Sequence, residues 1–176
     1  MRCRAPDDWQ PIALVAAVAV AALTKPALAQ DITFTPSATA ACLASEAPPR
    51  TCIGQSAEFC MEESPGGWTT VGMSACTWAE VEYWDDRLNA AYTALLAAHE
   101  AHDAENARLG ITAPSLTETL RDMQRSWIPH RDANCAYERA WWGGGTGQGP
   151  AGAACMLQMT GEQALELESW LVDVGR

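Results

Sequence analysis

Apolar residues recur at a spacing of three or four positions through the middle of the chain. The recurring positions are Trp84, Leu88, Tyr92 and Leu95. In a helix this spacing places all of them on one face, so the pattern predicts a long helix. The helix is expected to begin between Thr69 and Thr77 and to end near Gly110, since glycine commonly follows the last helical turn. Thr77 and Glu80 have the spacing of a capping box, but an earlier start also fits the pattern.

A second apolar stripe follows, and a capping signal marks its start. Ser115 is followed three positions later by Glu118, which is typical of a capping box. The stripe consists of Leu116, Leu120, Met123 and Trp127, continued by Arg131 and Cys135. Pro129 has no N–H to bond the carbonyl of Arg125, so we expect a kink there. The helix should end by Trp142, before a run of three glycines.

A third helix is predicted from about residue 151 to residue 174, after a glycine-rich connection. Its shared face is formed by Met156, Thr160, Gln163, Leu167 and Leu171. No stretch alternates with a period of two over a useful length, so no sheet is expected. The pattern therefore predicts an all-α fold, a small disulfide-stapled antiparallel helical bundle of about three main helices.

The first 29 residues have the three parts of a secretory signal peptide. Basic residues precede an apolar run from Ile12 to Leu23, and Ala27-Leu28-Ala29 fits the small-residue cleavage rule. We therefore expect cleavage after Ala29 and a mature chain that is periplasmic or secreted. An uncleaved membrane anchor is the alternative, but the apolar run is well short of the roughly 20 residues that span a bilayer. No membrane span is expected after cleavage.

The mature chain is expected to have two parts. Residues 30–59 are interpreted as a disordered arm, loosest over residues 30–41, followed by turns that disulfides pin. Residues 60–176 are interpreted as one helical domain. A chain of this length can bury a core of its own.

Six cysteines remain once Cys3 is removed with the signal peptide, and an even number in an exported chain indicates disulfides. Six cysteines allow 15 pairings. Local pairing is our expectation: Cys42 with Cys52, Cys60 with Cys76, and Cys135 with Cys155. A zinc site is the alternative, although the chain has no C-x-x-C pair.

The chain is strongly acidic, with a formal net charge of −11. The signal peptide takes away three basic and two acidic residues, so the mature chain is one unit more negative. This charge argues against a nucleic-acid partner, whose phosphates it would repel. It suits a basic protein partner, since opposite charges speed encounter, although solubility alone would also explain it.

Several motifs together resemble a known family. They are Trp84-Asp85-Asp86-Arg87-Leu88-Asn89 with Tyr92, Leu120-Arg121 with Gln124-Arg125 and Trp127, Arg131-Asp132 with Cys135, and Cys155 with Thr160. In this order they resemble the LprI-like lysozyme-inhibitor N-terminal domain family over about residues 60–171. The chain departs from the family pattern at Pro129, His130 and Gln163, and Cys42 and Cys52 look like additions. The resemblance implies a small secreted or periplasmic helical domain without catalysis or cofactor, whose partner is lysozyme or another basic wall-active enzyme.

Candidate partner-binding residues are Trp141, Trp142, Asp85 and Asp86. Adjacent helical residues point about 100° apart, so both tryptophans can hardly enter one core stripe. An exposed tryptophan is a frequent binding anchor, but both could instead pack under the glycine loop. The acids of the first long helix would attract a basic enzyme.

Arg131 falls on the buried stripe and is interpreted as a structural ion pair, because an unpaired buried charge is very costly. Asp85, Asp86 or Glu82 of the first long helix are its expected partners.

Two alternative functions stay open. One is an envelope scaffold or assembly protein with another partner. The other is a weak metal-binding or hydrolytic domain that uses His99 and His102, whose spacing is one residue short of the metalloprotease motif. No catalytic residue, metal or cofactor is expected under the leading hypothesis.

Overall fold

The computed structural model describes residues 31–174, which contain five α-helices, one 3-10 turn and no strand. The elements are α1 (Ser37–Leu43), the 3-10 turn η1 (Pro49–Cys52), α2 (Gln55–Glu63), α3 (Thr70–Arg108), α4 (Leu116–Trp141) and α5 (Gln148–Val174). The all-α fold is confirmed, and α3, α4 and α5 are the three long helices that the apolar pattern predicts. Two short helices precede them. The predicted signal peptide and its cleavage after Ala29 lie outside the described residues.

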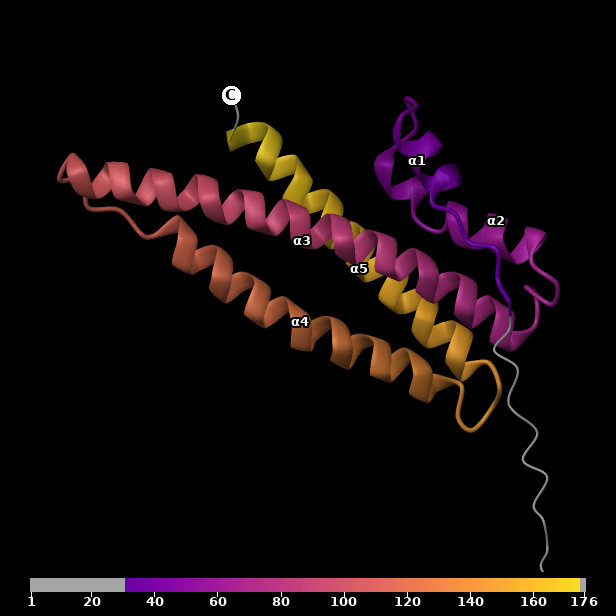
Figure 1. Cartoon of the computed structure of the whole chain (residues 1–176). Helices are drawn as coiled ribbons and strands as arrows, with labels where there is room; N and C mark the ends of the chain where they lie inside the picture. Colours follow the sequence, from indigo (N-terminus) through magenta and orange to yellow (C-terminus); the bar gives the residue numbers. More distant parts are fainter. Residues whose placement is uncertain (1–30, 175–176) are drawn as a thin grey trace, which may run out of the picture.

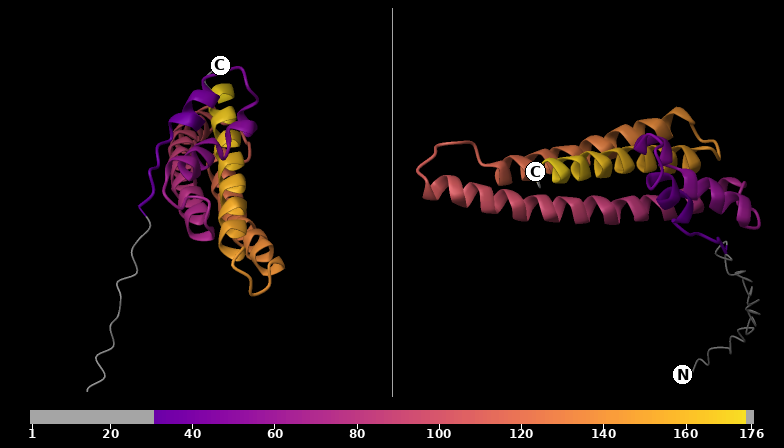
Figure 2. Two further views of the ribbon diagram at one scale, coloured as in Figure 1. Left: turned by 90° about the vertical axis from the view of Figure 1, so that its right-hand side faces the viewer. Right: turned by 90° about the horizontal axis from the view of Figure 1, so that it is seen from above.

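The three long helices lie side by side along a rod (Figures 1 and 2). α3 and α5 run in the same direction. α4 runs in the opposite direction and connects the C-terminal end of α3 to the N-terminal end of α5. The hairpin of α3 and α4 extends past the C-terminal end of α5, whereas α1 and α2 lie beside the first part of α3. The rod therefore has two different ends: one carries the short helices and the glycine loop, and the other is the bare hairpin.

The core lies where α3 and α5 face each other. Trp84, Leu95 and Leu167 are completely buried, and Leu88 and Leu157 are nearly so. Burying a large apolar side chain is worth about 1.5–3 kcal/mol, so this seam contributes strongly to the stability of the fold. The predicted stripe of α3 is confirmed, since Trp84, Leu88 and Leu95 are buried. Tyr92 is partly buried and packs against the core at the edge of this stripe.

α3 begins at the early end of the predicted interval. The Thr69 hydroxyl accepts a hydrogen bond from the Gly72 nitrogen at 3.1 Å, so Thr69 is the N-cap. Gly72 allows the preceding turn to approach the helix, because a Cβ there would lie 2.3 Å from the carbonyl oxygen of Gly66. The alternative cap formed by Thr77 and Glu80 is wrong, since both residues lie inside the helix and are buried.

α4 starts where the capping signal predicts it. The Ser115 hydroxyl accepts a hydrogen bond from the Glu118 nitrogen at 3.1 Å. The expected kink at Pro129 does not interrupt the helix, which runs continuously from Leu116 to Trp141. Pro129 and its neighbours are exposed, so water can satisfy the carbonyl that loses its helical partner. Leu116, which we expected on the buried stripe, is 40% exposed at the first position of α4.

The N-terminal lobe, which we define as residues 31–63, is ordered rather than a loose arm. α1 falls partly within residues 30–41, where we expected no structure, and Thr39 of this helix is completely buried. The Thr33 nitrogen donates to the Ser64 hydroxyl at 2.8 Å, which fixes the segment before α1 against the end of α2. A helix of seven residues has too few apolar positions to show a period, so sequence patterning could not predict it.

The structure contains the three local disulfides: Cys42–Cys52, Cys60–Cys76 and Cys135–Cys155. The first closes the N-terminal lobe, the second ties α2 to α3, and the third ties α4 to α5. All three lie toward the end of the rod that carries the short helices. No helix within residues 31–174 has both the length and the apolar character needed to cross a membrane.

Candidate functional site

Glu80 is the most enclosed charged residue of the structure. It is 0% exposed, and it has no cationic partner among residues 31–174. Its Oε1 accepts hydrogen bonds from Thr39 Oγ1 (2.9 Å), Gly54 N (2.8 Å) and Trp84 Nε1 (3.0 Å), and its Oε2 accepts one from Ala57 N (2.6 Å). All four partners are donors, which matches an ionised carboxylate because that group only accepts.

These bonds fix the N-terminal lobe onto α3. Gly54 is the N-cap of α2, so the Glu80 carboxylate lies at the positive end of that helix. Thr39 and Ser56 add a reciprocal pair, in which each backbone nitrogen donates to the other residue's hydroxyl at 2.9–3.0 Å. A carboxylate so enclosed has no access to a substrate, so Glu80 is a structural residue and not a candidate acid or base.

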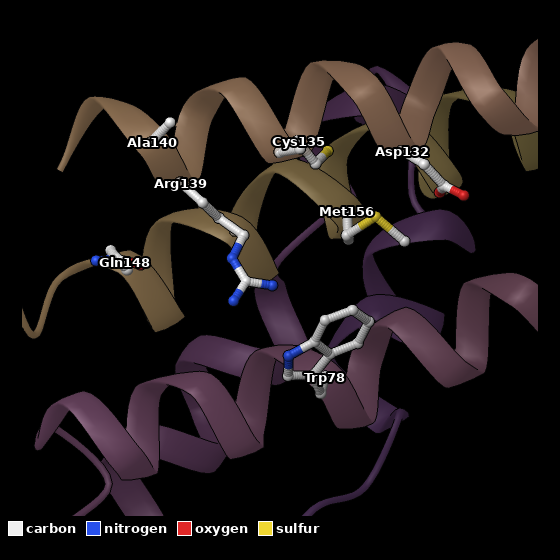
Figure 3. Close-up of a pocket in the computed structure, with 9 residues that line it drawn as sticks. Trp78, Asp132, Cys135, Arg139, Ala140, Gln148 and Met156 are labelled. Carbon is white, nitrogen blue, oxygen red and sulfur yellow. The ribbon is translucent and has the colours of Figure 1, made fainter. Parts of the chain in front are cut away.

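A surface groove lies between α3 and α4, with α5 as its floor, and we call it the α3–α4 groove (Figure 3). It has a volume of about 410 Å³. It is lined by Trp78 of α3, by Asp132, Cys135, Ala136, Arg139 and Ala140 of α4, and by Gln148, Gly152 and Met156 of α5. Its size is that of a small-molecule site, although it opens widely to solvent.

Arg139 and Trp78 face each other across this groove (Figure 3). The aliphatic part of Arg139 lies flat on Gly152, where a Cβ would lie 2.5 Å from its Cγ and Cδ. Only glycine leaves room for the arginine in this position. Trp78 is 41% exposed, so one of its surfaces is open to the groove. Sequence reasoning missed both residues, because their proximity depends on how the two helices cross.

Arg131 forms an ion pair, but the partners we expected for it are wrong. Its guanidinium donates to Asp132 at 2.9 Å and stacks over the Trp127 ring at 4.9 Å. The neighbouring residue supplies the carboxylate, whereas Glu82, Asp85 and Asp86 form no ion pair with Arg131. The side chain lies at the edge of the stripe, half-buried, where an adjacent acid can reach it.

Trp141 and Trp142 are both exposed, at 76% and 56%. Trp141 lies beside Tyr137, with ring centroids 6.2 Å apart. Trp142 instead lies under the glycine loop, since a Cβ on Gly147 would lie 2.4 Å from its ring. Trp142 therefore supports the loop, and Trp141 is the freer of the two.

The structure does not bring Asp85 and Asp86 together with Trp141. Asp85 follows Trp78 by seven residues, so both lie on the groove side of α3, and its carboxylate accepts a hydrogen bond from Asn89 at 2.8 Å. Asp86 is exposed and turned about 100° away from Asp85. Trp141 comes two residues after Arg139, about 200° around α4, so it points away from the groove.

The two histidines of α3 are not joined by a third possible metal ligand within the described residues. His99 is half-buried beside Leu120 and Trp170, and His102 is exposed. Within residues 31–174 no group of three or more His, Cys, Asp or Glu side chains could hold a metal ion.

Asp103, which follows the two histidines, has a structural role that the sequence did not reveal. Its carboxylate accepts hydrogen bonds from the Ser115 hydroxyl (2.7 Å) and from the nitrogens of Leu116 (3.0 Å) and Thr117 (3.1 Å). These bonds, led by that of Ser115, hold the pKa of Asp103 well below its usual value. Asp103 thus ties the start of α4 to the end of α3.

Several of the motif residues that suggested a family are buried in the helical bundle. Trp84, Leu88 and Thr160 are buried between α3 and α5. Gln163, one of the departures from the family pattern, donates through its amide to Gln124 at 3.3 Å inside the bundle. These buried motif residues therefore contribute to the packing of the fold.

Comparison with known proteins agrees with the motifs. The family model for lysozyme inhibitor LprI matches residues 60–167. The uncharacterized 17.7 kDa protein in the puhA 5′ region of Rhodobacter capsulatus is 28% identical over 135 residues, which cover 74% of this chain and 83% of that protein. An uncharacterized protein of Rhizobium meliloti (strain 1021) is 26% identical over 96 residues, 54% of this chain and 69% of that protein. No solved structure matches the chain. Since the family model covers more than half of the sequence, from the end of α2 through most of α5, the chain belongs to the lysozyme inhibitor LprI family.

Proposed function

We propose that this protein is a non-catalytic binding protein of the bacterial envelope that occludes a basic wall-active enzyme of the lysozyme type. Membership of the lysozyme inhibitor family is the single observation that carries the partner class. The three disulfides fit an extracytoplasmic location, because such bonds persist in oxidising compartments.

Trp141 is the proposed anchor of the interface. It is the most exposed of the large apolar side chains in residues 31–174, and Tyr137 supports it from one helical turn earlier. Tryptophan and tyrosine are enriched at binding hot spots, where one buried ring can contribute 2 kcal/mol or more. Trp142 contributes from beneath the glycine loop by holding the local backbone in place.

The acidic surface would speed the encounter with a basic enzyme. Glu82, Asp86 and Glu138 are exposed and make no ion pair within the described part of the chain. Charges of this kind steer association and are screened by salt, with a Debye length of about 10 Å at 0.1 M. Added salt should therefore slow association more than it changes dissociation.

The direct test is a titration of lysozyme with the mature, oxidised protein, using lysis of cell walls as the readout. The proposal expects inhibition that saturates near equimolar protein, and Trp141→Ala should weaken it by about 30-fold, the loss typical of a hot spot. Trp68→Ala is the matched control, since Trp68 is also exposed but lies on the turn before α3. Unchanged lysis at a stoichiometric excess would refute the proposal.

A further inference from the structure

We infer that the α3–α4 groove binds a carboxylate carried on a flat or branched apolar body, such as an aromatic acid or the end of a peptide. This inference goes beyond the proposed function, because it concerns a small ligand and does not depend on lysozyme.

The first observation is a free cation in an acidic protein. Arg87, Arg108, Arg121, Arg125 and Arg131 each pair with a carboxylate. Within residues 31–174, Arg50 and Arg139 are the arginines that do not. Acidic residues far outnumber arginines in this chain. The Arg139 guanidinium nevertheless points into the groove without a carboxylate partner among the described residues, so the fold keeps the acidic side chains away from it.

The nearest acids are held away from Arg139. Asp132 lines the same groove, but its Oδ1 accepts both hydrogen bonds from Arg131, and Figure 3 shows it far from the Arg139 guanidinium. Glu138 is adjacent in sequence but lies in another surface hollow, between α4 and α5. Neither acid neutralises the guanidinium.

The second observation is the opposite wall. The indole nitrogen of Trp78 lies on the side of the ring that faces Arg139 (Figure 3), and it has no hydrogen-bond acceptor in the described part of the chain. Two donors on opposite walls therefore converge on one space. A planar carboxylate fits this arrangement, since a guanidinium binds its two oxygens side by side and the indole N–H can donate to one of them.

The third observation is the apolar floor. Met156 of α5 lines the floor of the groove, and Ala136 and Cys135 of α4 line the wall beside it. A thioether adapts to aromatic and branched groups and favours contact with rings. The groove therefore suits a ligand whose charged end meets Arg139 and Trp78 and whose apolar end covers Met156.

The arginine is also positioned in advance. Its stem lies on Gly152, whose missing side chain leaves the required space. A side chain that is already held in its binding position loses less entropy when a ligand binds. Gly152→Ala should therefore displace the guanidinium and weaken binding while leaving the charge of the protein unchanged.

The test is a titration of the ¹⁵N-labelled mature protein with hippurate, followed by the tryptophan indole resonances, in which Trp78→Phe assigns the Trp78 signal. We expect the Trp78 signal to move, with a dissociation constant of about 1 mM, a value typical of a ligand of this size. N-benzoylglycinamide, which has the same shape without the charge, should bind at least about tenfold more weakly.

Variants and a second ligand make the test decisive. Arg139→Gln should weaken hippurate binding at least about tenfold, and Arg50→Gln, which removes the other unpaired arginine, should leave it unchanged. The peptide acetyl-Gly-Gly-Phe, compared with its C-terminal amide, distinguishes a peptide end from a free acid as the source. Circular dichroism verifies that each variant folds. Equal binding of acid and amide, an unchanged affinity in Arg139→Gln, or no movement of the Trp78 signal with either ligand would overturn the inference.

Discussion

The buried carboxylate of Glu80 offers the sharpest test of how this fold is held together. Glu80→Gln keeps the shape of the side chain but replaces one acceptor oxygen with an NH₂ donor. Three donors converge on Oε1, so the amide oxygen will occupy that side. The NH₂ group then faces the Ala57 N–H, which loses its acceptor at the N-terminus of α2.

The expected cost follows from these bonds. A hydrogen bond to a charged group is worth about 1 kcal/mol more than a neutral one, so the three retained bonds lose about 3 kcal/mol together. The unsatisfied Ala57 N–H adds about 2 kcal/mol. About 2 kcal/mol of this loss is offset, because the variant no longer buries a charge. We expect a net loss of about 3 kcal/mol in the free energy of unfolding.

Thermal unfolding of the oxidised protein measures this loss, and for a chain of this length it corresponds to a midpoint lower by about 10 °C. Hydrogen exchange should show its largest increase at the amides of α1 and α2. Glu82→Gln is the control, since Glu82 is exposed two residues further along α3 and should change stability by less than about 0.5 kcal/mol. If Glu80→Gln melts within about 2 °C of the wild type, the reasoning about Glu80 is refuted.

Two further predictions concern the ends of α3. Since the pKa of Asp103 is lowered in the folded protein, its stabilisation is complete above about pH 4 and is lost as the pH falls below that value; Asp103→Asn should flatten this part of a curve of urea midpoint against pH. An equal slope in both proteins would contradict the assignment. Gly72→Ala should destabilise by about 1–3 kcal/mol because its Cβ would collide with the Gly66 carbonyl oxygen, whereas Gly144→Ala, with no atom within 4 Å, should be nearly neutral in chemical denaturation. Equal urea midpoints for the two variants would contradict the prediction, because they would show that the turn before α3 moves to accommodate the added Cβ.

The long elements of the fold were predictable because their signals are local. Ser115 and Glu118 mark the start of α4 within four residues, and Trp84 and Leu88 reveal the buried face of α3 by spacing alone. The disulfides pair near neighbours in sequence, so proximity along the chain was a sufficient guide. Each of these features depends on residues that are close in the chain.

The parts that were missed depend on residues that are distant in the chain. α1 is stabilised by the contact of Thr39 with Glu80, 41 positions apart, and no local pattern reports that contact. The groove between Trp78 and Arg139 exists only because two helices cross at a particular distance. Arg131 shows the opposite error, because we expected a distant acid and the adjacent Asp132 supplies the carboxylate.

The disulfide connectivity has a consequence for biogenesis. Each bond joins cysteines that are 10, 16 or 20 positions apart, so each can close soon after its second cysteine emerges into an oxidising compartment. No disulfide joins the first half of the protein, which contains α1, α2 and α3, to the second half, which contains α4 and α5. Oxidation therefore closes three separate loops, and the packing of α4 and α5 on the earlier helices rests on non-covalent contacts, chiefly those between α3 and α5. No disulfide encloses the chain between Cys76 and Cys135, so the hairpin of α3 and α4 has no cross-link at its far end, where residues 109–115 connect the two helices.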